Sequence, residues 1–146
     1  MKSNPSLAGH VHFVCGQLCT FRAWKLPFTA VNTMESELCG ASDAAKTVIW
    51  LKKLYEQVLG KSCGTVPIYI DNAAGKANSQ GSRKLRTVRH IGMNLRFLQE
   101  QVHQGVVFAE WIPGKENPAD LMTKNVKQST FEYLLPRMMK VVDEKK

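Results

Sequence analysis

The longest regular pattern in the sequence is a set of apolar residues at helical spacing within residues 32–59. These residues recur three or four positions apart and are Leu38, Ala41, Ala45, Val48, Leu51, Tyr55 and Val58. Asn32 can cap the free N–H groups of the first turn, and Glu35 stands where a capping box places its acid. Gly60 follows the last apolar position, which is typical of a helix C-terminus. The pattern predicts one long amphipathic helix.

Shorter apolar runs on both sides of this helix predict four strands. Two precede it, at 10–15 and 18–24, and are joined by a short hairpin turn at Gly16-Gln17. Two follow it, at 66–70 and 106–112. The run at 66–70 is apolar throughout and ends in Asp71-Asn72, as is typical of a buried strand.

Four further helices are predicted after residue 72. They are a brief helix at 73–78, an amphipathic helix at 89–104, a helix that begins at Asn117 with Pro118 in its first position, and a helix at 128–142 interrupted by Pro136. The resulting order of elements predicts a mixed α/β domain whose first two strands are antiparallel. We expect this domain to span residues 1–126, with residues 127–146 forming a C-terminal helical tail.

Length and composition fit one globular domain that needs neither a metal nor a disulfide to fold. The chain has 146 residues, of which 44% are hydrophobic and 22% are charged. No run reaches the roughly 18 apolar residues of a membrane helix, so no membrane partner is expected. The four cysteines show no Cys-x-x-Cys spacing. They indicate reduced thiols inside a cell, in the cytoplasm or the nucleus.

The net charge of +8 is concentrated in one segment. No acidic residue occurs between Asp71 and Glu100. The basic residues of this segment, with one histidine, are Lys76, Arg83, Lys84, Arg86, Arg89, His90 and Arg96. A basic stripe of this kind suits a polyanion, because each neutralised phosphate releases counterions. A solvated loop on a basic protein explains the charge equally well, and charge alone does not separate the two.

Three acids lie at the ends of predicted elements: Glu37 near the start of the long helix, Asp71 after a buried strand, and Asp120 in the helix after the last strand. Carboxylates at such positions can bind Mg²⁺ or Mn²⁺ together with waters and phosphate oxygens. Two ions roughly 4 Å apart can promote phosphodiester cleavage. Each acid also has a purely structural explanation, as a helix-dipole partner or in an Asx turn.

Five segments in uninterrupted order resemble the ribonuclease H domain of copia-type retrotransposon pol polyproteins. Residues 34–41 (MESELCGA) are similar to its helix motif Thr-Glu-Ala-Glu-Tyr-x-Ala, and 45–51 (AKTVIWL) to the continuation. Residues 68–72 (IYIDN) match its Asp-Asn strand end, and 89–91 (RHI) its basic-His-Ile segment. The stretch from Trp111-Ile112-Pro113 to 119–124 (ADLMTK) is similar to its closing signature.

The resemblance implies an α/β ribonuclease H-like fold, a mixed sheet with flanking helices. It also implies an endonuclease that cuts the RNA of RNA–DNA hybrids with two Mg²⁺ or Mn²⁺ ions. Glu37 and Asp71 would hold one ion and Asp120 the other. The reverse transcriptase portion of the same polyprotein would be a partner.

The family's first strand and its first catalytic aspartate, which contacts both ions, have no counterpart in the sequence. No acidic residue precedes Glu35. The alternative to an impaired enzyme is therefore an inactive module that binds nucleic acid or docks to reverse transcriptase. A zinc site made of His10, His12, Cys15 and Cys19 is disfavoured, because strand alternation scatters these residues over both faces.

Overall fold

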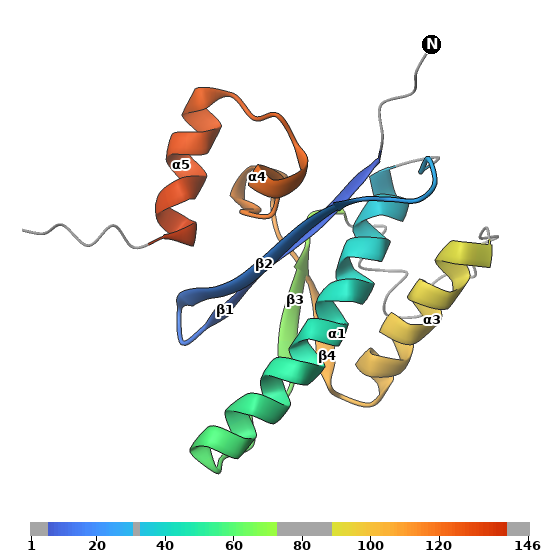
Figure 1. Cartoon of the computed structure of the whole chain (residues 1–146), viewed down its shortest axis with the longest axis vertical. Coiled ribbons are helices and arrows are strands. Elements are labelled where there is room, and N and C mark those ends of the chain that lie inside the picture. Colours follow the sequence, from blue (N-terminus) through green and yellow to red (C-terminus); the bar gives the residue numbers. More distant parts are fainter. Residues whose placement is uncertain (1–5, 31–32, 73–88, 140–146) are drawn as a thin grey trace, which may run out of the picture.

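The computed structural model describes residues 6–30, 33–72 and 89–139, which form a mixed α/β fold (Figure 1). The elements are β1 (Leu7–Val14), β2 (Gln17–Lys25), α1 (Thr33–Leu59), β3 (Val66–Ile70), α3 (Arg89–His103), β4 (Val107–Trp111), η1 (Gly114–Glu116), α4 (Asp120–Thr123) and α5 (Gln128–Met138). The predicted cap at Asn32 and the predicted helix at 73–78 lie outside the described residues.

The first two strands form the predicted antiparallel hairpin, but the predicted turn is wrong by one residue. The register pairs Val14 with Gln17, so the turn consists of Cys15 and Gly16. Both have positive φ, 52° at Cys15 and 76° at Gly16. A two-residue turn of this kind needs a left-handed backbone at both central positions. The sequence analysis placed this turn at Gly16-Gln17, one residue further along the chain.

The main core lies between α1, α3 and the parallel pair β3–β4. It is formed by the buried side chains Leu38, Ala41, Ala45, Val48, Ile68, Ile70, Leu95, Leu98, Val107 and Ala109. The α1 members of this set follow the helical periodicity of the sequence, and the strand members follow the alternation of β3 and β4. No helix among the described residues is long and apolar enough to cross a membrane.

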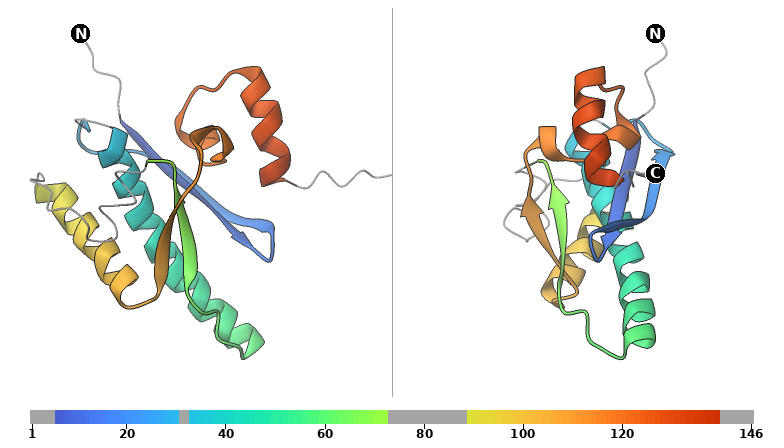
Figure 2. Two further views of the ribbon diagram at one scale, coloured as in Figure 1. Left: turned by 180° about the vertical axis from the view of Figure 1, so that it is seen from behind. Right: turned by 90° about the vertical axis from the view of Figure 1, so that its left-hand side faces the viewer.

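The four strands form two separate two-stranded sheets, β1–β2 and β3–β4. Both lie against α1, and the β1 edge faces the β3 edge (Figure 2). A groove of about 620 Å³ runs between them, with residues of β1 and β3 as its walls. Small residues of α1, Gly40, Ala41 and Ala44, also line it. Within the described residues, no ladder of backbone hydrogen bonds joins β1 to β3.

The two prolines of the C-terminal region do not act as predicted. Pro118 precedes α4, which begins at Asp120, because turns of 3₁₀ type, Asp120 N–H to Asn117 O and Leu121 N–H to Pro118 O, occupy the intervening residues. Pro136 lies inside α5, where the helix continues to Met138. This helix is anchored by Leu134 and Met138, which are buried.

Candidate functional site

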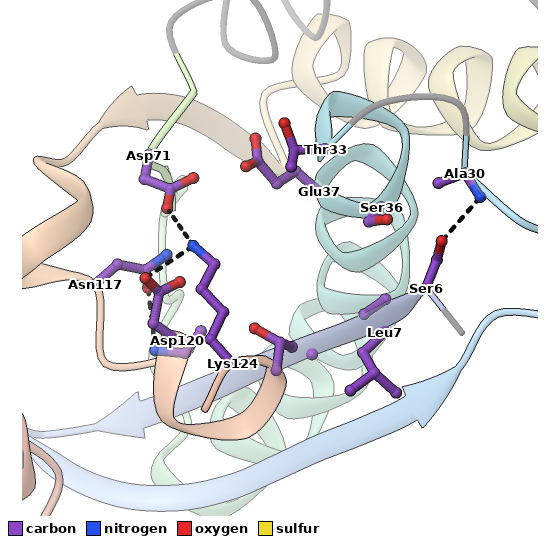
Figure 3. Close-up of a pocket in the computed structure, with 14 residues that line it drawn as sticks. Ser6, Leu7, Ala30, Thr33, Ser36, Glu37, Asp71, Asn117, Asp120 and Lys124 are labelled. Carbon is purple, nitrogen blue, oxygen red and sulfur yellow. Dashed lines mark hydrogen bonds and ion pairs between the residues drawn. The ribbon is translucent and has the colours of Figure 1, made fainter. Parts of the chain in front are cut away.

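The three acids singled out in the sequence line one pocket of about 370 Å³ (Figure 3). Glu37 lies in the second turn of α1, Asp71 directly follows β3, and Asp120 is the first residue of α4. Three segments far apart in the sequence therefore bring carboxylates to the same place. Their catalytic role stays a prediction.

The position of Asp71 is fixed by the neighbouring strand. Ile112 N–H donates to the carbonyl of Ile70, which extends the β3–β4 pairing past the end of β4. The indole Nε1 of Trp111 donates to the carbonyl of Asp71 at 3.0 Å. Trp111 is half-exposed, and this hydrogen bond helps to hold the backbone of Asp71 in place. The carboxylate of Asp71 thus emerges from an ordered strand end.

The position of Asp120 depends on close packing between α4 and β1. A Cβ on Gly9 would lie 2.7 Å from Thr123 Cγ2 and 3.1 Å from Met122 Cβ. Only a residue without a side chain permits this approach. Gly9 also lies against Gly40, since a Cβ on Gly40 would be 3.2 Å from the carbonyl oxygen of Gly9. The contact therefore joins β1, α1 and α4 beside the acids.

A lysine completes the cluster, and sequence reasoning assigned it no role. The Lys124 ammonium lies 2.9 Å from Oδ2 of Asp120 and 3.7 Å from Oδ2 of Asp71. Burial alone lowers the pKa of Lys124, but the hydrogen bond to Asp120 and the three nearby acids outweigh burial and raise it. Lys124 follows Asp120 by four residues, a helical spacing that could have indicated the ion pair between them.

The electrostatics of the pocket favour additional positive charge. Burial first, then repulsion from Asp71 and a hydrogen bond with it, raise the pKa of Glu37 to about 7. Burial also raises the pKa of Asp120, although Lys124 opposes this shift. The Oε2 atom of Glu37 is buried and has no hydrogen-bond partner. This oxygen is an unused acceptor.

The donor set fits a hard divalent cation. The three side chains offer only carboxylate oxygens, which Mg²⁺ and Mn²⁺ prefer, and one of these oxygens is unpaired. Within residues 6–30, 33–72 and 89–139, however, no three His, Cys, Asp or Glu side chains are already arranged to hold one ion. The Lys124 ammonium lies instead between Asp71 and Asp120 (Figure 3).

The predicted nucleic-acid contacts fall mostly outside the described residues. This applies to Lys76, Arg83, Lys84 and Arg86. Arg89 and His90 begin α3, but their side chains are also outside the described part. Arg96 is the basic residue of the stripe whose side chain the structure describes, and it is exposed on α3. Nucleic-acid binding stays a prediction.

The histidines of the hairpin belong to a different cluster, on the face of β1 that packs on α1. His10 Nε2 lies 3.0 Å from Oδ2 of Asp43, and His12 Nε2 lies 2.9 Å from Nδ1 of His10. Arg22 donates to the same Asp43 oxygen at 2.8 Å. Cys15 and Cys19 are exposed free thiols. The histidines therefore join the hairpin to α1.

Comparison with known proteins supports an origin in a retrotransposon. The chain is 27% identical over 127 residues to a retrovirus-related Pol polyprotein from the transposon TNT 1-94 of tobacco, Nicotiana tabacum. The match covers 87% of the chain and 10% of that polyprotein. No family model and no solved structure matches the chain.

Proposed function

We propose that the chain is a ribonuclease H-like part of a retrotransposon pol polyprotein, whose intact parent cuts the RNA strand of RNA–DNA hybrids. The observation that carries the proposal is the convergence of Glu37, Asp71 and Asp120 in one pocket from three separate segments. The similarity to a Pol polyprotein supports it independently of this geometry.

In this proposal Glu37 and Asp71 would hold one Mg²⁺ or Mn²⁺ ion and Asp120 would hold the other. Such ions supply an activated water and stabilise the leaving oxygen in phosphodiester hydrolysis. The protein contributes the orientation of the carboxylates: Asp71 is set by the strand pairing and by Trp111, and Asp120 by α4. The basic stripe that begins at Lys76 would contact the phosphates of the hybrid.

The groove between β1 and β3 supports the expectation that the fold is completed by another strand. β1 and β3 run in opposite directions along α1 (Figure 1). One inserted strand can therefore pair antiparallel with β1 and parallel with β3 at the same time. The α1 wall of small residues leaves room for it, and Glu37 and Asp71 line the same groove. An aspartate on this strand would meet the acidic pocket.

The second candidate is an inactive module that binds nucleic acid or docks to reverse transcriptase. The observation that favours this inactive module is the arrangement of the acids in the part of the chain that the structure describes. No three of them are poised to hold one ion, and a lysine lies among them. The two functions differ in one property, which is hydrolysis.

Cleavage of a labelled RNA–DNA hybrid in Mg²⁺ separates these functions. The experiment compares the chain itself with a version extended before Met1 by a short turn and a strand that carries an aspartate. We expect poor or no cleavage by the chain itself, because three carboxylates offset the repulsion between two neighbouring divalent ions less well than four carboxylates do. The extended protein should cleave, and Asp71→Asn in it should abolish cleavage.

Glu110→Gln, at an exposed acid on β4, is the matched control and should leave cleavage intact. A folded extended protein that binds the hybrid without cutting it would support the inactive module. Strong Mg²⁺-dependent cleavage by the chain itself, abolished by Asp71→Asn, would show that another group fills the bridging position.

A further inference from the structure

Lys124 is the one cationic side chain that the described salt bridges place among the three acids. Its ammonium contacts carboxylates from two segments, the end of β3 and the start of α4. The charge of Glu37 also acts on the Lys124 ammonium, but the two side chains make no ion pair within 4 Å in the described structure. The lysine therefore neutralises part of the cluster and leaves Glu37 Oε2 without a partner.

The contacts of Lys124 allow it to leave this position. Its side chain is 52% exposed, and the hydrogen bond and ion pairs that the structure gives its ammonium are with Asp120 and Asp71. The backbone of Lys124 is held separately, by a hydrogen bond from its N–H to the carbonyl of Asp120. A change of side-chain rotamer can thus move the ammonium into solvent without unfolding α4.

We propose that Lys124 is a built-in counter-cation that competes with the divalent metal ion for the carboxylates of Asp71 and Asp120. The inference rests on the proposed metal-dependent function and adds a regulating residue to that site. With the ammonium bound, the acids are partly neutralised and the pocket is closed to a metal ion. With the ammonium in solvent, the same oxygens are free to converge on a divalent cation.

Metal affinity in the absence of catalysis tests this competition. Mn²⁺ binding to the chain is measured by electron paramagnetic resonance and by calorimetry, without nucleic acid. Lys124→Met removes the charge and keeps most of the length. It should bind Mn²⁺ about tenfold more tightly, since two partly exposed ion pairs no longer have to be broken. Lys124→Arg keeps the charge and should bind like the original chain.

A second readout is thermal stability. Without metal, Lys124→Met should melt at a lower temperature than the original chain, because three acids are left without their cation. Saturating Mn²⁺ should raise its melting temperature more than it raises that of the original chain. Lys127→Met is the matched control, because Lys127 is exposed and has no ion pair among the described residues; it should change neither quantity.

The outcomes separate this inference from the proposed function. Equal or weaker Mn²⁺ binding by Lys124→Met would overturn the competition. If Lys124→Met binds Mn²⁺ tightly and Asp71→Asn in that background does not, the competition stands whether or not the extended protein cleaves a hybrid. If cleavage occurs but the lysine variants bind metal alike, only the role of Lys124 is wrong.

Discussion

The buried histidine pair of β1 predicts a specific dependence of stability on pH. His12 is buried, and burial, followed by the charge of His10, lowers its pKa from 6.5 to about 4; Asp43 opposes this. His12 contacts His10, which binds Asp43, and Arg22 donates to the same Asp43 oxygen. A histidine held neutral in the folded protein binds more protons after unfolding at any pH between the two pKa values. The folded state is therefore destabilised as the pH falls through this window.

The magnitude follows from these two pKa values. Proton linkage predicts that His12 lowers the free energy of unfolding by about 2 kcal/mol between about pH 7 and about pH 5, and by about 3 kcal/mol at about pH 4. Glu37 has the opposite shift, to about 7, so its contribution opposes that of His12 in the same range. A comparison with a His12 variant cancels the contribution of Glu37.

His12→Gln is the appropriate variant, because an amide can still donate to Nδ1 of His10 but does not titrate. Urea unfolding is followed by circular dichroism for both proteins across this pH range. We expect the original chain to lose about 2 kcal/mol relative to His12→Gln by about pH 5. Parallel pH profiles for the two proteins would refute the assignment of a neutral, buried His12, and with it the docking of the hairpin on α1.

Three further predictions concern packing and binding. Gly9→Ala should lower the free energy of unfolding, measured in urea, by about 2 kcal/mol, because its Cβ would meet Thr123 and Met122. Gly92→Ala is the control; its Cβ would have nothing within 4 Å, and it should raise the free energy of unfolding by up to about 1 kcal/mol. Equal effects would contradict the contact of α4 with β1. Leu38→Ala removes a side chain with 0% exposure and should cost about 3 kcal/mol, while Leu54→Ala, at 43% exposure, should cost less than about 1 kcal/mol. Neutralising Arg83, Lys84, Arg86 and Arg89 should flatten the salt dependence of hybrid binding by about one unit of slope per lost contact, and an unchanged slope would identify the stripe as a solvated loop.

Elements with long or uniform patterns were predictable from the sequence. α1 spans Thr33–Leu59 as its periodicity predicts, and β3 spans Val66–Ile70 as predicted. Local patterns failed where a backbone conformation depended on surroundings. Cys15 has a left-handed backbone because a two-residue turn imposes it. Pro136 is accommodated within α5 instead of interrupting it.

The acids of the candidate site were predictable from the sequence, but the placement of the lysine that partly neutralises them was not. Acids at the ends of elements can converge when strands and helices meet at one edge, so position singled out Glu37, Asp71 and Asp120. The resemblance to the copia-type domain then assigned them to one site. The i,i+4 spacing of Lys124 and Asp120 could indicate their ion pair, but the approach of the Lys124 ammonium to Asp71 depends on how α4 packs against β1 through Gly9. The pairing of His10 with Asp43 likewise joins residues 33 positions apart.

The central claim is that Glu37, Asp71 and Asp120 form one site for divalent cations. An anomalous difference map from crystals of the chain soaked in Mn²⁺ tests it most directly. The account predicts a peak in contact with carboxylate oxygens of these acids, with the Lys124 side chain turned into solvent. A fully soaked crystal with no peak there, and with Lys124 still bound to Asp120, would contradict it.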